Sequence, residues 1–373
     1  MLKRILVFLT VLCTMTVSVS ALDAGDVSAE CAVLINEQTG EVLFEKNAYS
    51  GHSMASTTKI MTSLLAAESG KLHDEITVKK AMINVEGTSM GLLDGDSVSL
   101  YELIYGMLLS SGNDAANVTA CYLGGNVENF ASMMNQKAAE LGMKNTHFVT
   151  PSGLDDDEHY STAYDMALLG RNAVKNPVFR AACSSKKAVL TYGNPPYRRT
   201  LYNHNRLLSS YKYALGIKTG FTKKSGRCLV SYAENDGVGL VAVTLNAPND
   251  WSDHRKMLDF GFSAVEKTEI TAKIPQKLNV VGGNVENVGI KSKPFAFSGV
   301  DKNKVTQKIS LERFLYAPVN KGDKVGEVKF YFNGECIGTC DIVAETAASV
   351  QNSDTKQEKK GFLERVKERL FND

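Results

Sequence analysis

Ser56-Thr57-Thr58-Lys59, Ser111-Gly112-Asn113 and Lys218-Thr219-Gly220 occur once each, in this order, in a chain of 373 residues. Each string alone is a weak pattern. Together they offer a serine nucleophile, a lysine that can take its proton, a second serine beside an asparagine, and a Lys-Thr-Gly segment able to hold a carboxylate. The set therefore predicts one active site for serine-dependent acyl transfer, assembled from three distant segments.

The spacing of Ser56 and Lys59 suits proton transfer. Residues three apart share one face of a helix, so the Lys59 amine can reach the Ser56 hydroxyl. Serine is a weak nucleophile without a base, and a lysine amine with its ordinary pKa of about 10.4 is protonated at neutral pH. We therefore expect burial and a nearby Lys218 to lower the pKa of Lys59.

A family resemblance rests on the residues around the first two strings, Ala55-Ser56-Thr57-Thr58-Lys59-Ile60-Met61-Thr62 and Leu109-Ser110-Ser111-Gly112-Asn113-Asp114-Ala115. They resemble the low-molecular-mass penicillin-binding proteins that act as serine-type D-alanyl-D-alanine carboxypeptidases, with Gly112 in place of the aspartate of the Ser-Asp-Asn form. The resemblance covers residues 25–265. It implies an α/β (α+β) penicilloyl-serine transferase, or β-lactamase-like, domain with an antiparallel sheet and a helical cluster, followed by a small all-β domain.

The resemblance also implies a role for each motif residue. It implies catalytic roles for Ser56, Lys59 and Ser111, and substrate-binding roles for Asn113, Lys218, Thr219, Gly220, Phe221 and Thr222. Ser111 would carry a proton to the leaving amine, and Asn113 would bond the substrate backbone. Lys218 and Thr219 would hold the terminal carboxylate, while the backbone N–H groups of Ser56 and Phe221 would form the oxyanion hole.

The implied substrate is the peptidoglycan stem peptide ending in D-Ala-D-Ala, and β-lactam antibiotics would acylate the same Ser56. The sequence separates neither carboxypeptidase from endopeptidase action on cross-links nor a vegetative from a sporulation role. Because no Cys-x-x-Cys or His-x-x-x-His spacing occurs, we expect neither a metal nor another cofactor. The formal net charge of +1 lacks the basic excess of nucleic-acid-binding proteins, so we expect no nucleic acid partner.

Three alternatives compete with this interpretation. Gly87-Thr88-Ser89-Met90-Gly91 fits the nucleophile elbow of α/β-hydrolases, but no apolar strand precedes it and no sustained helix follows. A class A β-lactamase needs an additional deacylating glutamate, for which Glu158 is the acid-rich candidate. A non-catalytic penicillin-recognising scaffold would not need the intact Ser56, Lys59 and Lys218.

Helices and strands are expected in a definite order. The pattern predicts a hairpin at 31–46, helices from Ser56, from Ser99 towards Ser111, at 166–174 and at 251–265, and strands at 217–220, 227–234 and 238–246. Strands at both ends of the segment, with helices between them, indicate one sheet covered by helices. Residues 268–345 read as a separate β domain with a hairpin turn at Asn333-Gly334.

The two ends of the chain indicate export and membrane attachment. Lys3 and Arg4 precede an uncharged run at 5–22 that ends in Val19-Ser20-Ala21, so we expect residues 1–21 to be a signal peptide rather than a retained anchor. Residues 346–360 read as a linker. Residues 361–373 place four apolar side chains within about 100° of a helical wheel, which predicts an amphipathic helix on the membrane surface, with a frayed or docked tail as the alternative. We therefore expect the extracytoplasmic face of a bacterial membrane.

The overall composition fits a large globular protein with an ordinary core. Apolar residues make up 43% of the chain and charged residues 22%. Six of the seven cysteines lie beyond the predicted leader, and a domain of this size does not need disulfides. Cys336 and Cys340 on one continuous strand would lie roughly 13 Å apart, too far for a bridge.

Overall fold

The computed structural model describes residues 21–299 and 301–351. These residues form two compact units. The first contains the described residues as far as Lys267 together with 297–299, and the second contains 268–296 and 301–351. The return of 297–299 to the first unit is not visible in the sequence pattern.

The first unit is built on an antiparallel sheet with strand order β2-β1-β9-β8-β7. The strands are β1 (Cys31–Asn36), β2 (Val42–Lys46), β7 (Ala214–Thr222), β8 (Gly226–Asn235) and β9 (Val238–Leu245). The sheet therefore joins the first and last pieces of the unit, as the order of the elements predicts. In this order β7, which carries the Lys-Thr-Gly motif, is an edge strand.

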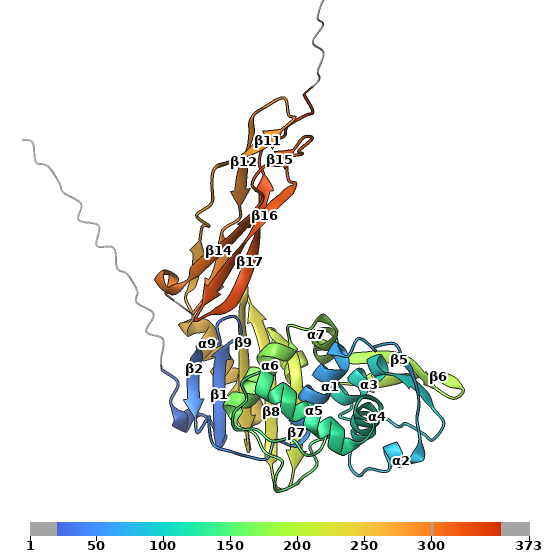
Figure 1. Ribbon diagram of the computed structural model, residues 1–373. Coiled ribbons are helices and arrows are strands. Elements are labelled where there is room, and N and C mark those ends of the chain that lie inside the picture. Colours follow the sequence, from blue (N-terminus) through green and yellow to red (C-terminus); the bar gives the residue numbers. More distant parts are fainter. Residues whose placement is uncertain (1–20, 300, 352–373) are drawn as a thin grey trace, which may run out of the picture. The chain divides into compact units, whose positions relative to one another are not determined.

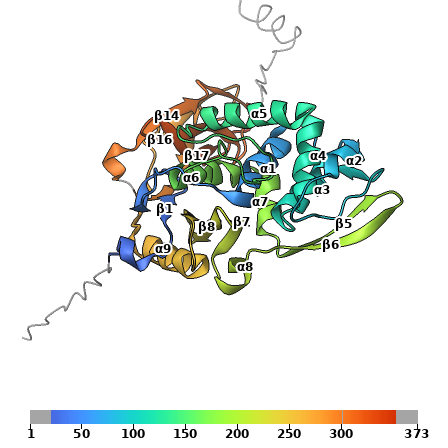
Figure 2. The same cartoon turned by 90° about the horizontal axis from the view of Figure 1, so that it is seen from below.

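Both faces of the sheet are buried, so β1 and β9 are buried along their whole length and mostly apolar. Successive side chains of a strand point to opposite faces. Val33 and Val243 pack with the helical cluster on one face, whereas Leu34 and Leu240 pack with Met257 of α9 on the other. Figures 1 and 2 show the sheet between α9 (Asp250–Ala264) and the helices of the cluster.

The helical cluster lies between β2 and β7 in the sequence. Its longer helices are α1 (Lys59–Glu68), α3 (Leu100–Leu108), α4 (Asn113–Gly124), α5 (Val127–Glu140), α6 (Ala163–Ala173) and α7 (Pro177–Ser184). Ser99 and Glu102 form the predicted capping box of α3. Thr162 caps α6 through the N–H of Asp165, whose own carboxylate bonds to Asn145 and Thr146 instead.

Short elements connect these parts of the first unit. They are η1 (Ala24–Asp26), η2 (Ala55–Thr58), β3 (Glu75–Thr77), α2 (Lys80–Ile83), β4 (Ser97–Ser99), β5 (Lys187–Gly193), β6 (Pro196–Tyr202) and α8 (Leu207–Ser210). The predicted helix from Ser56 begins as the 3₁₀ turn η2 and becomes α-helical at Lys59.

The second unit is all β apart from one 3₁₀ turn among its described residues. The elements from residue 267 onward are β10 (Lys267–Ile270), β11 (Lys277–Val281), β12 (Asn287–Ser292), β13 (Phe295–Ser298), η3 (Lys302–Lys304), β14 (Thr306–Leu311), β15 (Leu315–Tyr316), β16 (Lys324–Phe332) and β17 (Glu335–Ala344). Its main sheet has the order β14-β16-β17-β12-β11-β15. Asn333 and Gly334 both have positive φ, +48° and +85°, which is the two-residue hairpin turn that their sequence predicts.

The second unit extends further along the chain than expected. Ala348 pairs with Val319, and Val350 pairs with Gly283, so the predicted linker at 346–360 begins no earlier than the end of these pairs. The predicted leader at 1–21 (except Ala21) and the predicted helix at 361–373 lie outside the described residues.

Cysteine and metal chemistry can be assessed only for the described part of the chain. There the six cysteines are free thiols, and Cys336 and Cys340 lie on one strand, β17. Residues 21–299 and 301–351 contain no group of three His, Cys, Asp or Glu side chains suited to a metal ion. In the same stretches no helix combines the length and the apolar character that spanning a bilayer requires.

Candidate active site

The nucleophile motif sits in the turn that leads into α1. Ala55 has a positive φ of +48°, and Thr57 Oγ1 donates to the Met54 carbonyl at 2.6 Å, so the chain turns tightly just before Ser56. The 3₁₀ turn and the first residue of α1 bring the Lys59 Nζ within 2.9 Å of the Ser56 Oγ. The predicted contact between nucleophile and base is therefore present.

The Lys59 amine has three polar neighbours, and their chemistry defines its state. Besides Ser56 Oγ, Nζ lies 2.7 Å from Asn113 Oδ1 and 2.7 Å from the Ser152 carbonyl oxygen. Both of these oxygens can only accept hydrogen bonds. A neutral amine donates its two N–H bonds to them and is left with a lone pair directed at the Ser56 hydroxyl, which can donate.

Burial favours this neutral amine. Lys59 is fully buried, and desolvation, followed by the charge of Lys218, holds its pKa well below the ordinary value. The negative charge of Asp114 acts in the opposite direction. Desolvation penalises the charged form of lysine, so the geometry and the electrostatics both favour a neutral Lys59 amine.

The second motif places its residues at the start of α4. Ser111 has a positive φ of +60°, and Gly112 is the N-cap of the helix. The Asn113 amide is fixed at both ends, because Oδ1 accepts from Lys59 and Nδ2 donates to the Glu86 carbonyl at 2.6 Å. The motif therefore links the base to the loop that begins at Glu86.

The third motif lies on β7, directly against the nucleophile turn. A Cβ atom at Gly220 would lie 3.0 Å from the Ser56 backbone nitrogen, so a glycine here lets the strand approach the turn closely. The Thr222 hydroxyl donates to Asp155 Oδ1 at 2.9 Å. Phe221 is exposed on the rim.

Lys218 of the third motif has a covered position. It is buried and absent from the lining of the cavity, and its Nζ donates to the Thr219 carbonyl at 2.8 Å. Burial lowers the pKa of Lys218 to about 7. The side chain therefore lies behind the strand, next to the cavity wall rather than in it.

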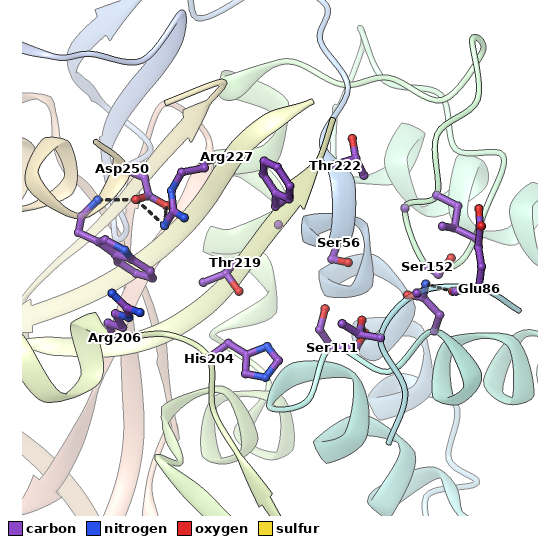
Figure 3. Close-up of a pocket in the computed structure, with 18 residues that line it drawn as sticks. Ser56, Glu86, Ser111, Ser152, His204, Arg206, Thr219, Thr222, Arg227 and Asp250 are labelled. Carbon is purple, nitrogen blue, oxygen red and sulfur yellow. Dashed lines mark hydrogen bonds and ion pairs between the residues drawn. The ribbon is translucent and has the colours of Figure 1, made fainter. Parts of the chain in front are cut away.

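The three motifs converge on one cavity of about 560 Å³ (Figure 3). Its lining comprises Ser56, Glu86, Gly87, Thr88, Ser111, Asn113, Ser152, Gly153, Leu154, His204, Arg206, Thr219, Gly220, Phe221, Thr222, Arg227, Asp250 and Trp251. All predicted site residues are in this wall except Lys59 and Lys218, which are buried next to it.

The cavity is basic on one side. Arg206 and Arg227 lie on the same side of Ser56 as Thr219 in Figure 3. Arg227 Nη2 is 2.9 Å from each carboxylate oxygen of Asp250, and its guanidinium lies over the Trp251 ring. Because Arg227 is paired with Asp250, Arg206 is the cation on that side that is more available to a ligand.

A buried carboxylate fixes the loop at 86–92. Asp114 accepts hydrogen bonds from the Ser89 hydroxyl at 2.5 Å and from the N–H groups of Met90, Gly91 and Leu92 at 2.9 to 3.1 Å. The Ser89 hydroxyl therefore donates to a carboxylate that holds the loop in place. The loop also lacks the strand and helix of a nucleophile elbow. The α/β-hydrolase alternative fails on this geometry.

A second buried network of hydrogen bonds supports the nucleophile turn through Thr58. His159 Nδ1 accepts from the Val149 N–H at 2.9 Å, so the proton is assigned to Nε2, which donates to Thr58 Oγ1 at 2.8 Å. Thr58 Oγ1 in turn donates to the Ala55 carbonyl at 2.9 Å. Burial lowers the pKa of His159 to about 4, which keeps the ring neutral and this chain of donors in order.

Glu158 does not reach the site. Its side chain is exposed and absent from the cavity wall. Its carbonyl oxygen lies 2.6 Å from His147 Nδ1, and its backbone N–H donates to Asp156 Oδ1 at 2.8 Å. The carboxylates that line the cavity are Glu86 and Asp250, and Asp250 is paired with Arg227. The acid that a class A β-lactamase would need is therefore not supplied by Glu158.

The fold and the site together define a class of protein. A two-faced antiparallel sheet with a helical cluster presents a Ser-x-x-Lys turn, a Ser-x-Asn turn and a Lys-Thr-Gly edge strand to one cavity, and this is the arrangement of penicillin-binding serine peptidases. Residues 15–249 match the family model described as D-alanyl-D-alanine carboxypeptidase, and residues 266–349 match the C-terminal domain of penicillin-binding protein 5. The chain belongs to the D-alanyl-D-alanine carboxypeptidase family, and its activity is that of a serine-type D-Ala-D-Ala carboxypeptidase.

Individual relatives agree over most of the chain. D-alanyl-D-alanine carboxypeptidase DacF of Bacillus subtilis (strain 168) is 31% identical over 331 residues, which are 85% of each chain. DacC of Escherichia coli (strain K12) is 34% identical over 343 residues, 84% of this chain and 83% of that protein. The crystal structure of DacD from Francisella tularensis aligns with a TM-score of 0.63 and 27% identity, covering 89% of this chain and 95% of that one.

Proposed function

We propose that this chain removes the terminal D-alanine from peptidoglycan stem peptides through an acyl-Ser56 intermediate. The observation that carries the proposal is the contact of the buried Lys59 Nζ with Ser56 Oγ, while two pure acceptors occupy the other N–H positions of the amine. Such an amine can take the serine proton at the moment of attack.

Acylation follows from this geometry. Ser56 Oγ attacks the carbonyl carbon of the penultimate D-alanine, and its proton passes to Lys59 Nζ. The N–H groups of Ser56 and Phe221 stabilise the oxyanion, a role supported by the close approach of Gly220 to Ser56. The C–N bond then breaks, Ser111 relays the proton to the leaving nitrogen, and D-alanine departs as a neutral amine.

Deacylation returns the enzyme to its starting state. Water attacks the acyl-Ser56 ester, one water proton is taken by the Lys59 amine, and the ester C–O bond breaks. The proton then returns to Ser56 Oγ, and the shortened peptide leaves as a carboxylate after its acid group has given the second water proton to solvent. Each step uses the same base and the same oxyanion donors, so no further acid group is required.

Substrate binding uses the edge strand and the basic side of the cavity. The Thr219 hydroxyl binds the terminal carboxylate, and the charge of Lys218 behind the strand adds attraction without direct contact. Asn113 bonds the substrate backbone and Thr222 supports the strand beyond Gly220. β-Lactams acylate Ser56 by the same first step, because their amide carbonyl occupies the same position.

Labelling and product release test this function. A labelled penicillin should become covalently attached to Ser56, as peptide mapping shows, and a peptide ending in D-Ala-D-Ala should release D-alanine. Lys59→Ala should abolish both. Label on another serine, or rapid penicillin hydrolysis with no D-alanine release, would reject the proposal in favour of a different enzyme.

We propose in addition that the chain works outside the cytoplasm, at the membrane surface. The support is the sequence pattern of a signal peptide at 1–21 and of an amphipathic helix at 361–373. A substrate in the cell wall requires the same location. The linker joins this helix to the second unit, whose paired residues reach Val350.

A further inference from the structure

Arg199 is a nearly buried cation that lies outside the active-site cavity. It belongs to β6, which forms a hairpin with β5 at the edge of the helical cluster (Figures 1 and 2). Its side chain is 10% exposed, and it is not among the residues that line the cavity. Burying a guanidinium group is costly unless its charge and its N–H groups find partners. The partners of Arg199 therefore indicate what the residue does.

The guanidinium group contacts two aromatic rings, a carboxylate and a backbone carbonyl. Its Cζ lies 4.3 Å from the centre of the Tyr192 ring and 4.2 Å from that of the Tyr197 ring, and such contacts stabilise a cation. Nη2 lies 3.1 Å from Oδ2 of the buried Asp96. Nη1 donates to the Gly91 carbonyl. Because the rings and the ion pair fix the guanidinium group, Arg199 in turn fixes the backbone at Gly91.

The segment at 90–92 is bonded to two different parts of the first unit. Its carbonyl groups are held by the hairpin, since the Tyr192 hydroxyl donates to the first of them at 3.0 Å and Arg199 donates to the second. The N–H groups of all three residues donate to the carboxylate of Asp114 on α4. The segment therefore connects the hairpin to the helix that begins with the second motif.

The residues just before this segment contact the second motif itself. The Thr88 carbonyl accepts from the Asn113 N–H at 2.7 Å, and the Thr88 hydroxyl donates to the Ser111 carbonyl at 2.5 Å. The Glu86 carbonyl accepts from Asn113 Nδ2 at 2.6 Å. Asn113 Oδ1 in turn accepts from the Lys59 amine. A shift of the loop would therefore displace the asparagine that orients the base.

We propose that Arg199 is a positioning residue for acylation, which fixes the segment at 90–92 from the hairpin side and so keeps Asn113 in place against Lys59. The inference rests on the proposed function and adds to it a residue from outside the cavity. Small displacements of reacting groups are costly in rate, so loss of Arg199 should lower the rate constant of acylation about tenfold. Ligand binding should change little, because Arg199 does not line the cavity.

The time course of penicillin labelling at increasing penicillin concentration measures the effect. In Arg199→Gln the limiting rate constant should fall about tenfold, whereas the half-saturating concentration and the final amount of label per folded chain should not change. Arg199→Lys keeps the charge beside Asp96, but one ammonium group lacks the fork that reaches Asp96 and Gly91 together. Its rate constant should lie between those of Arg199→Gln and the unaltered chain. Because this variant preserves the buried charge, it decides the test where Arg199→Gln does not fold.

Arg198→Gln is the matched control, since Arg198 is the preceding residue of β6 and its side chain is exposed. It should label at the rate of the unaltered chain. A purely structural role of Arg199 would reduce the number of chains that label without slowing the remainder. That result, an unchanged rate constant in the Arg199 variants, or equal slowing in Arg198→Gln would overturn the inference. Absence of Ser56 labelling in the unaltered chain would instead reject the proposed function.

Discussion

The carboxylate of Asp114 accepts a hydrogen bond from the hydroxyl of Ser89 at 2.5 Å, across 25 residues of sequence. Asp114 immediately follows Asn113 of the second motif, and Ser89 belongs to the loop that supplies the Glu86 carbonyl to Asn113. One buried carboxylate therefore connects the Ser-x-Asn motif to the neighbouring loop that lines the cavity at Glu86, Gly87 and Thr88. The asparagine that binds Lys59 is oriented by this connection.

Replacing Asp114 with asparagine should slow acylation and alter its pH dependence. An amide offers one acceptor atom where the carboxylate serves four donors from the loop, and small displacements of catalytic groups are costly, so the rate of β-lactam acylation should fall about tenfold or more. The charge of Asp114 raises the pKa of Lys59. Its removal should lower that pKa and move the acidic limb of the acylation profile to lower pH.

A second buried aspartate provides the control for this measurement. Asp96 accepts from Arg199 and from the Leu93 N–H, and it is not among the groups whose charge acts on Lys59. Asp96→Asn should leave the acidic limb where it is. An unshifted limb in Asp114→Asn would contradict the electrostatic part of the prediction.

Gly153→Ala should damage the nucleophile turn. Gly153 has a φ of +83°, and a Cβ atom there would overlap the Ala55 carbonyl oxygen directly before Ser56. We expect slower acylation together with a loss of stability greater than the backbone penalty alone. Gly142→Ala is the matched control, since Gly142 has a φ of +77° with open space around it. The control should cost about 1 kcal/mol in unfolding free energy and leave penicillin labelling intact.

His159→Gln should make the free energy of unfolding depend less on pH between about 6.5 and 4. Burial lowers the pKa of His159 to about 4, whereas an unfolded histidine titrates near 6.5. As the pH falls, the unfolded state therefore binds the proton before the folded state does. The contribution of His159 to the free energy of unfolding is complete above pH 6.5 and is lost as the pH falls towards 4. The loss is about 3 kcal/mol in unfolding free energy.

Denaturant unfolding across this pH range measures the effect. The buried His254, whose pKa burial lowers to about 3, contributes in the same direction, so a residual slope should remain in the variant. His73→Gln changes an exposed histidine and should reproduce the slope of the unaltered chain. An identical slope in His159→Gln would show that the ring does not stay neutral in the folded state.

The predicted C-terminal helix should bind vesicles through its apolar face. Leu363→Asn together with Val366→Asn removes apolar burial without adding charge, and it should release the chain from anionic vesicles in a sedimentation assay. Glu364→Gln together with Glu368→Gln alters the opposite face and should not weaken binding. A chain ending at Gln351, which keeps the paired Ala348 and Val350, should stay in solution; equal vesicle binding by this truncated chain would rule the helix out as the anchor.

The sequence indicates the fold and the reacting groups because these depend on short-range patterns. Apolar runs at both ends of the first unit predicted the strands of one sheet, and the Ser-x-x-Lys spacing predicted the contact of Ser56 with Lys59. The Asn333-Gly334 dipeptide likewise specified its hairpin. Within each strand, motif or turn, the residues that decide the outcome lie within a few positions of one another, and the joining of the two ends in one sheet follows from the order of the elements.

The supporting residues were not predicted, because their partners are distant in the sequence and their types are common. His159 reaches Thr58 across 101 residues, and Ser152 offers only a backbone carbonyl to Lys59. Neither contact leaves a spacing pattern. Asp114 had a usable signal, since it directly follows the second motif at the first turn of a helix. The covered position of Lys218 depends on side-chain packing and is therefore beyond pattern analysis.

The edge position of β7 has a consequence for contacts between copies of the protein. An edge strand with open backbone groups invites pairing with the sheet of another molecule, which leads to aggregation. Here the open edge borders a cavity whose opposite wall carries Ser111 and Asn113. A single extended peptide can add itself to such an edge as a further strand. The sheet is thus left incomplete at the strand that carries the Lys-Thr-Gly motif, next to the cavity.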